Sequence, residues 1–189
     1  MKKNLILDIY NSKNSVFSIK DIALLWGESD TELVKTRVHR YVKANKLYSI
    51  RKSFYSKNND YNKQELATKI YTPSYISFET VLGKAGVTFQ HYSQIFIASY
   101  LTREIFADRQ TYSYRKIKES ILTNNAGIEH KNNYSIATPE RAFLDMVYLS
   151  KDYHFDNLSV LNWNKVFEIL SIYSNKRMEK EIKSYQKNI

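Results

Sequence analysis

Apolar residues recur with helical spacing in the first third of the chain. After Phe17 and a capping residue, Ser18, they predict a short helix that stops at Gly27. A second helix is predicted to begin at Ser29 and Glu32, because this Ser-x-x-Glu spacing lets each side chain satisfy a backbone N–H at the helix start. The apolar residues of the second helix share one face, which must be buried. They are Val34, Val38, Tyr41 and Val42.

A hairpin is predicted after this second helix, which ends near Asn45. Two β-prone segments, residues 47–50 and 54–56, flank a basic turn at residues 51–53. An earlier helix over residues 3–13 adds another apolar side to the same core: Leu5, Ile6, Ile9 and Tyr10. This order of elements is typical of a winged helix-turn-helix, whose second helix enters the major groove while the hairpin, or wing, touches the DNA backbone.

The outer face of the second helix is cationic. Residues 33–57 contain eight Lys or Arg and no Asp or Glu. Such a face can be merely solvated, and winged helices also serve as protein-docking modules. The agreement of charge, helix order and hairpin favours duplex DNA. At about 100° per residue, the side chains that point away from the apolar stripe or flank it are Lys35, Thr36, Arg37, His39, Arg40 and Lys43. With Arg51 and Lys52 of the hairpin, they are the predicted DNA-binding residues.

A polar stretch at residues 57–63 breaks the pattern and predicts a domain boundary. We therefore expect a winged helix-turn-helix at residues 1–57 and a second, α+β domain at residues 58–189. The second domain is expected to begin with a short helix over residues 64–70 and an extended segment around Pro73. The next helix, over residues 78–85, has Ser77 as its expected cap and Gly86 as its end.

The pattern then changes to that of strands. Residues 94–100, 103–106 and 110–117 are rich in β-branched and aromatic residues and predict an antiparallel meander with one exposed side. Two more short strands are expected near Ile128 and at residues 134–137. Thr138 is the expected cap of a helix that runs to about Leu149. Its expected buried residues are Ala142, Phe143, Met146 and Leu149, and two last helices are expected at residues 163–173 and 176–187.

Charge supports an anionic partner for the first domain. The chain has a net charge of +10, and residues 1–57 hold twelve Lys or Arg against five Asp or Glu. The absence of cysteine excludes disulfides and thiolate metal sites and fits a reducing cytoplasm. The first residues do not form a signal peptide, and no apolar run approaches the roughly 20 residues of a membrane helix. We therefore expect a soluble, cytoplasmic protein.

Catalytic and metal chemistry have no clear basis in the sequence. The histidines His39, His91, His130 and His154 lack metal-ligand spacing, and four glycines provide no phosphate-binding loop. Glu181 and Lys183 have a nuclease-like spacing but lie in a predicted helix. We expect no enzyme activity, cofactor or metal. Five basic residues lie on or beside the predicted strands: Arg103, Arg109, Arg115, Lys116 and Lys118. They could bind a protein, RNA or flanking DNA, or they could simply be the solvated charges that sheet edges often carry.

Two motifs in the second domain carry a resemblance. With Pro-Ser-Tyr-Ile-Ser-Phe-Glu at residues 73–79 and Ala-Thr-Pro-Glu-Arg-Ala-Phe-Leu-Asp at 137–145, the sequence resembles the AbiEi family of abortive-infection antitoxins. Residues 37–42 and 51–55 resemble the DNA-binding domain of the same family. The chain departs from the family at Asn45 and Ser53, where glycine is usual. Both motifs contain helix-start signals, and we assign neither a catalytic role.

The resemblance implies a DNA-binding antitoxin of a type IV toxin–antitoxin pair. Such a protein represses its own operon by binding upstream of its gene, and it counteracts a nucleotidyltransferase toxin encoded beside it. The alternative is a winged-helix transcriptional regulator whose second domain senses a ligand or forms a dimer. A nuclease or other enzyme is the third hypothesis. A nucleotidyltransferase-like gene immediately downstream would favour the antitoxin over the regulator.

Overall fold

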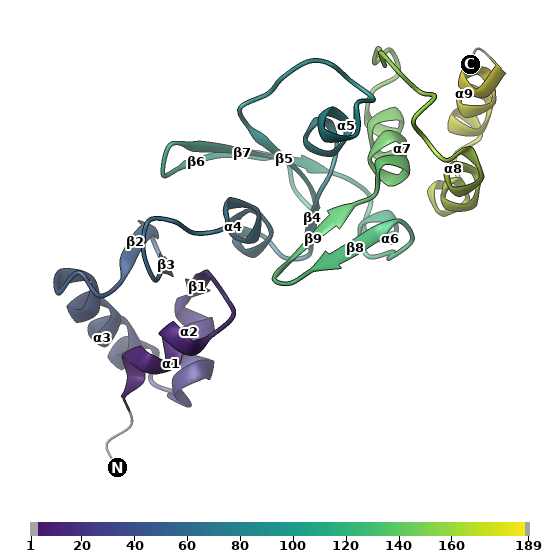
Figure 1. The fold of residues 1–189 in the computed structure, drawn as a ribbon. Helices are drawn as coiled ribbons and strands as arrows, with labels where there is room; N and C mark the ends of the chain where they lie inside the picture. Colours follow the sequence, from purple (N-terminus) through teal and green to yellow (C-terminus); the bar gives the residue numbers. More distant parts are fainter. Residues whose placement is uncertain (1–3, 188–189) are drawn as a thin grey trace. The chain divides into compact units, whose positions relative to one another are not determined.

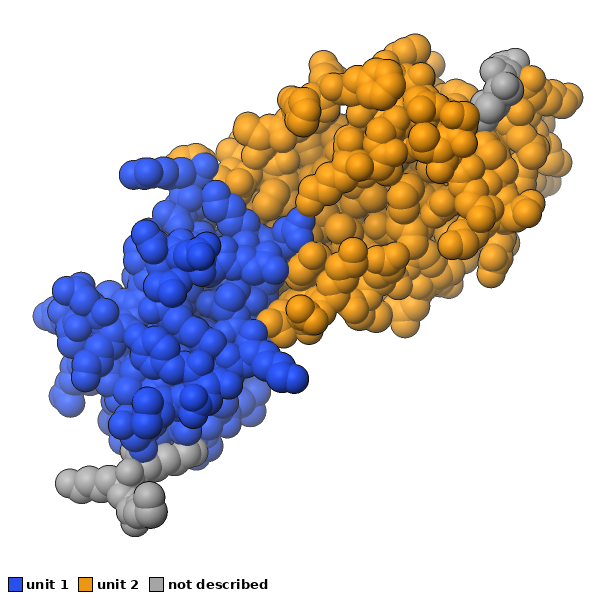
Figure 2. Space-filling view, viewed as in Figure 1, with its two compact units in different colours: residues 1–66, 107–109 blue, residues 67–106, 110–189 orange. Residues whose placement is uncertain are grey.

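The computed structural model describes residues 4–187 and divides the chain into two compact units (Figures 1 and 2). Unit 1 comprises the chain up to Leu66 together with Ala107–Arg109, and unit 2 comprises Ala67–Phe106 and the residues from Gln110 on. Both units combine helices with a sheet, so the α+β class is confirmed. The division lies after Leu66, whereas the polar stretch had predicted it after residue 57.

Unit 1 extends past residue 57 because the following segment is bonded back to its beginning. The Glu65 carboxylate accepts hydrogen bonds from the backbone N–H (2.9 Å) and the hydroxyl (2.7 Å) of Ser15. The Asn62 N–H donates to the same hydroxyl at 2.9 Å, and the Tyr61 side chain is buried. The polar stretch therefore belongs to the first compact unit.

Three helices and a three-stranded sheet make up most of unit 1. They are α1 (Leu5–Asn11), β1 (Val16–Ser18), α2 (Ile19–Trp26), α3 (Thr31–Lys43), β2 (Tyr48–Arg51) and β3 (Phe54–Ser56). The strands are antiparallel in the order β1-β3-β2. Strand β1 was not predicted, since its three residues form a strand only by pairing with β3, far along the chain. Ile9, Phe17, Ile22, Val34 and Val38 lie at the centre of the core with almost no exposure.

Local signals predicted the ends of α2 but not the start of α3. Ser18 and Asp21 form a reciprocal capping box at α2, and Gly27 ends this helix with φ 66°. At α3 the cap is Asp30, whose carboxylate accepts from the N–H groups of Glu32 (2.9 Å) and Leu33 (3.1 Å). The predicted box of Ser29 and Glu32 is therefore wrong. A carboxylate at the helix start forms stronger, charge-assisted bonds than a hydroxyl and suits the helix dipole.

Tyr10 is the one wrongly assigned residue of the expected α1 face. Its side chain is 44% exposed, and its hydroxyl donates to the Lys46 carbonyl at 2.8 Å. Ile6 and Ile9, three residues apart, take the buried side of this short helix. The Tyr10 side chain therefore lies outside the buried core and bonds the backbone that follows α3.

Unit 2 is built on a six-stranded mixed sheet in the order β6-β7-β5-β4-β9-β8. Its strands are β4 (Ser74–Ile76), β5 (Ile95–Ser99), β6 (Arg103–Ala107), β7 (Gln110–Lys116), β8 (Ile128–Lys131) and β9 (Tyr134–Ala137). Helix α4 (Lys63–Ile70) begins in unit 1 and ends in unit 2. The helices that follow are α5 (Glu79–Ala85), α6 (Glu119–Leu122), α7 (Pro139–Leu149), α8 (Trp163–Leu170) and α9 (Lys176–Lys187), with a 3-10 turn at Ser171–Tyr173. Helix α6 was not predicted.

The expected antiparallel meander is wrong. Strand β7 lies between β5 and β6, so β5 pairs with β7 in parallel, from Ile95 opposite Tyr112 to Ser99 opposite Lys116. Asp108 and Arg109 turn the chain from β6 into β7 with positive φ at both positions, as a tight hairpin requires. Strand pairing between non-consecutive segments depends on packing that the hydrophobic pattern does not record.

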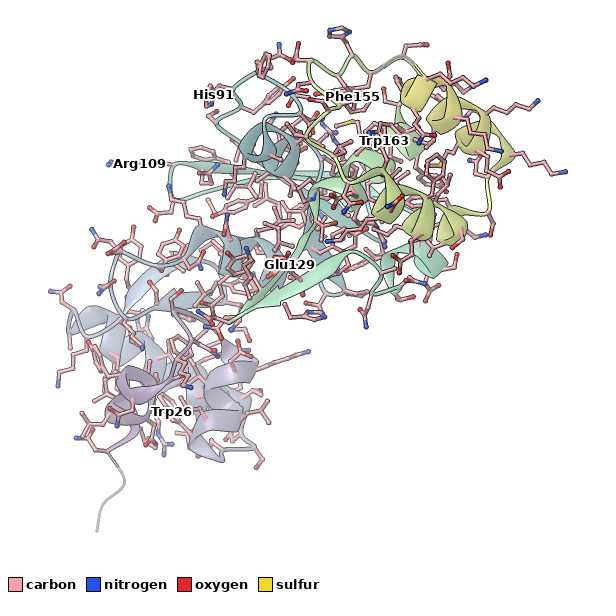
Figure 3. The ribbon with its side chains drawn as sticks, turned by 45° about the vertical axis from the view of Figure 1, so that its right-hand side comes forward. Trp26, His91, Arg109, Glu129, Phe155 and Trp163 are labelled. Carbon is pink, nitrogen blue, oxygen red and sulfur yellow. The ribbon has the colours of Figure 1, made fainter. Side chains whose placement is uncertain are left out.

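Both faces of the central strands are covered, which corrects the prediction of one exposed side. Tyr112 and Tyr114 are buried on one face of β7, while Ser113 and Arg115 on the other are only partly exposed. Helices α5 and α7 pack together beside the sheet (Figure 1). Phe143 of α7 contacts the rings of Phe155 and Trp163, both labelled in Figure 3.

Two expectations for the helices of unit 2 are wrong. Ser77 does not cap α5, because its hydroxyl donates to the buried Asp145 carboxylate at 2.8 Å. Phe78 precedes this helix with φ 55° and makes no side-chain cap. Leu149 is 40% exposed, because it is the last residue of α7 and lies beyond the run of buried residues that ends at Val147. The caps at Thr138 and Gly86 are confirmed.

Candidate nucleic-acid interface

Helix α3 is anchored by one face and exposed on the other. Val34 and Val38 have no exposed surface, and Tyr41 sets its ring edge-on to Trp26 at 6.1 Å between centroids. Trp26 is labelled in Figure 3, and its indole N–H donates to the Leu5 carbonyl at 2.8 Å. These contacts fix the rotation of α3 about its axis. The opposite face must therefore point to solvent.

Most of the predicted DNA-binding residues are exposed. Lys35, Thr36, His39, Arg40, Lys43 and Lys52 are exposed, and Arg37 and Arg51 are partly buried. Arg40, Lys43 and Lys52 make no hydrogen bond or ion pair through their side chains with any residue from 4 to 187. Their positive charges are therefore available to an outside anion.

Two predicted residues of α3 are instead paired within the protein. Arg37 lies 3.1 Å from the Glu28 carboxylate, and this pair is partly shielded from solvent. Lys35 lies 2.6 Å from Glu32, but both of these side chains are largely exposed. An exposed pair of this kind contributes little and exchanges readily with another anion. Arg37 is thus the more firmly held of the two.

The basic turn of the hairpin formed by β2 and β3 is held by side-chain and backbone contacts. Arg51 pairs with Phe54 in the sheet and also lies over the Phe54 ring, 5.8 Å from its centroid. Ser53 adopts φ 68°, and its carbonyl accepts a hydrogen bond from the Ile19 N–H at 3.3 Å. Asn45, after α3, likewise adopts positive φ, at 53°. Both residues thus adopt the left-handed conformation without being glycine.

A second group of polar residues joins the two motifs of unit 2. Arg141 and Asp145 of α7 form an ion pair at 3.3 Å with no exposed surface on either side chain. The Asp145 carboxylate also accepts from the hydroxyls of Tyr75 (3.0 Å), Ser77 (2.8 Å) and Tyr173 (2.6 Å). The sequence motifs contain four of these five residues, but only the structure shows that they meet.

The same network ties the Arg141 guanidinium to the backbone. It donates to the carbonyls of Ile121 and Ala126, each at 2.7 Å, and to the Tyr75 hydroxyl at 2.9 Å. Burial raises the pKa of the Asp145 carboxyl, although Arg141 and the hydroxyl donors oppose this increase. Burial also raises the pKa of Tyr75 and Tyr173 well above their usual value. Since these groups are enclosed and paired, we assign them a structural role.

Arg115 does not join the other basic residues of the strands. Its guanidinium pairs with the buried Glu79 carboxylate at 2.8 Å and lies over the Phe96 ring, 4.4 Å from the centroid. Lys116 and Lys118, in contrast, are exposed. Arg103 and Arg109 are exposed too, and Figure 3 labels Arg109 at the turn between β6 and β7. Arg115 is therefore excluded from any exposed basic surface of these strands.

No group of three or more His, Asp or Glu among residues 4–187 is arranged to hold a metal ion. Glu181, of the nuclease-like spacing, pairs with Arg177 at 2.6 Å. Within the same described range, no helix has both the length and the apolar character needed to span a bilayer. Neither a scan against models of known protein families nor a search of curated proteins finds a match to this chain.

Proposed function

We propose that unit 1 is a winged helix-turn-helix that binds duplex DNA through α3 and the hairpin of β2 and β3. The observation that carries this proposal is the exposed face of α3, where Arg40 and Lys43 have no partner among residues 4–187 while Val34 and Val38 anchor the other side. A rigid helix with free cations on one face fits the major groove, which admits an α-helix.

The individual residues divide by the kind of contact that they can make. Thr36, His39 and Arg40 lie on the exposed face of α3 and can reach base edges, where arginine pairs with guanine through two hydrogen bonds. Lys43 and Lys52 offer point charges that suit phosphates. Base contacts give sequence specificity, whereas phosphate contacts give affinity that depends on salt.

The biological role that we propose is that of an antitoxin which represses its own operon. Support comes from the resemblance of residues 73–79 and 137–145 to the AbiEi family and from the basic α3 face. On this proposal the DNA site lies upstream of the gene, and the toxin is a nucleotidyltransferase encoded beside it. A transcriptional regulator outside any toxin–antitoxin pair would use the same unit 1, so the adjacent reading frame distinguishes the two roles.

The experiment is a binding titration with duplex DNA from upstream of the gene. Arg40→Ala should reduce discrimination between the operator and other sequences by about 1–3 kcal/mol, because a bidentate base contact is lost. Lys52→Ala should weaken binding to all sequences alike and should flatten the dependence on salt.

A triple variant, Lys35→Ala/Arg40→Ala/Lys52→Ala, tests the whole interface. Its matched control is Lys176→Ala/Lys180→Ala/Lys183→Ala, which removes three exposed positive charges from α9 instead. The proposal requires a large loss of affinity in the first variant and a small one in the control. Equal binding by wild type and the first variant would show that α3 and the hairpin do not contact DNA.

A further inference from the structure

Three hollows in unit 2 share lining residues, and we call them together the groove. The largest, of about 640 Å³, shares Thr72, Pro73 and Leu122 with a second of about 340 Å³. The second shares Thr72, Ser74, His130 and Ser135 with a third of about 300 Å³. The groove therefore runs past the start of β4, from the segment after β7 to the hairpin of β8 and β9; these elements can be followed in Figure 1.

The two ends of this groove are positively charged. Lys116 and Lys118 line one end, and Lys69 and Lys131 line the other, where Lys131 also pairs with the exposed Glu129 carboxylate at 3.3 Å. Glu119 is the one carboxylate among the described lining residues. Lys116 and Lys118 are exposed and form no ion pair with residues 4–187, so their charges are not neutralised within the described chain. Such a charge distribution complements a chain of phosphates.

The groove also offers a stacking surface and hydrogen-bonding groups. Tyr100, beside the first pair of lysines, is 44% exposed and is held edge-on by Tyr71 at 6.1 Å between ring centroids. Proteins that bind single-stranded nucleic acids stack the bases on aromatic rings beside a positively charged groove. The middle of the groove carries hydroxyl, amide and imidazole groups: Thr72, Ser74, Asn125, His130 and Ser135.

We propose that this groove binds single-stranded RNA. A duplex hides its bases from an exposed ring, whereas a single strand can stack a base on Tyr100 while its phosphates lie against the lysines. The uncharged polar groups between the two basic ends suit the ribose 2′-hydroxyl, which DNA lacks. The proposal concerns unit 2 alone and does not depend on DNA binding by unit 1.

The test measures fluorescence anisotropy of a labelled single-stranded RNA of about ten nucleotides, within the roughly 4–16 nucleotides of comparable sites. The full chain carries the unit 1 variant Lys35→Ala/Arg40→Ala/Lys52→Ala, so that α3 does not contribute. On this background, Lys116→Glu/Lys118→Glu and Tyr100→Ala should each weaken binding by at least about fivefold. The matched control is Lys180→Glu/Lys183→Glu on α9, whose residues line none of the three hollows and should leave binding within about twofold.

Each other outcome contradicts the proposal. An equal loss in the α9 control would mean that only net charge attracts the RNA. Equally tight binding of DNA with the same sequence would remove the preference for RNA. Unchanged binding in both groove variants, or no binding by their shared background, would show that the groove is not the site. Circular dichroism of each variant establishes that a loss of binding is not a loss of fold.

Discussion

At the scale of single residues, the most consequential feature of unit 2 is a charged pair with no access to water. Arg141 and Asp145 are both fully buried, and each is surrounded by hydrogen-bonding partners. Burial of a charge is unfavourable unless it is paired and bonded, so the fold of unit 2 depends on keeping the network complete.

We therefore expect Asp145→Ala to lower the free energy of unfolding by about 3–5 kcal/mol, because it leaves the Arg141 guanidinium buried without its counter-charge. Chemical denaturation followed by circular dichroism measures the change. Glu168→Ala is the control, since Glu168 is an exposed acid on a neighbouring helix and should change stability by no more than about 0.5 kcal/mol. A similar, small effect for both substitutions would contradict the structural role of Asp145.

Gly127 and Gly83 differ in the space that each leaves for a side chain. Gly127 adopts φ 71°, and a Cβ atom there would lie 2.8 Å from both Arg141 Cβ and Ile169 Cδ1. Gly83, within α5, has its nearest neighbour at 3.8 Å from such an atom. Gly127→Ala should therefore destabilise the protein by about 1–3 kcal/mol. Gly83→Ala should be neutral or stabilise it by up to about 1 kcal/mol. Thermal unfolding of the two variants checks the opposite signs.

At the scale of elements, the start of α3 depends on one side chain. Asp30 accepts two backbone N–H groups that would otherwise face solvent without an intrahelical partner. Because α3 carries the proposed DNA-binding face, its first turn also affects how firmly Thr36 and Arg40 are presented. The cap thus links local stability to the proposed function.

We expect Asp30→Ala to cost about 1 kcal/mol of stability, the typical effect of removing a helix cap. Ser29→Ala, at the position that sequence spacing had favoured, should cost much less. Denaturant titrations of the two variants distinguish the two caps. A larger effect at Ser29 than at Asp30 would restore the Ser-x-x-Glu assignment.

At the scale of the whole molecule, the division into two units predicts where the chain can be cut so that unit 1 keeps its contacts. The segment after residue 57 contributes the Glu65 carboxylate that bonds Ser15 twice. The Lys57 ammonium, which a fragment of residues 1–57 retains, donates to the Ser12 carbonyl at 2.6 Å. A fragment cut after residue 57 lacks Glu65 and Asn62, although it retains the residues proposed to bind DNA.

A fragment of residues 1–70, which keeps α4 whole, should therefore be more stable than residues 1–57 by about 1.5–3 kcal/mol, the range for bonds to a charged group. Urea titrations of the two fragments provide the measurement. Glu65→Ala in the longer fragment should reproduce much of the difference. Equal stability of the two fragments would mean that the compact unit ends at residue 57 after all.

The sequence by itself determined the local features of this protein. The apolar spacing of Val34 and Val38 predicted the buried face of α3, and the signals at Ser18, Gly27 and Thr138 predicted helix ends that the structure confirms. These features depend on residues within one or two turns of each other, where side-chain spacing and capping act directly. The exposed basic face of α3 follows from the same periodicity, which is why the candidate DNA-binding residues of this helix could be predicted.

Only the tertiary structure decided which distant segments meet. Ser77 bonds Asp145 rather than the start of α5, and β7 lies between β5 and β6. The groove likewise brings together Lys69, Lys118 and Lys131 from three separate segments. Such contacts are selected by the burial of the whole core and by the need to pair every buried polar group. Local spacing does not encode these choices, since each partner satisfies its local pattern equally well without the other.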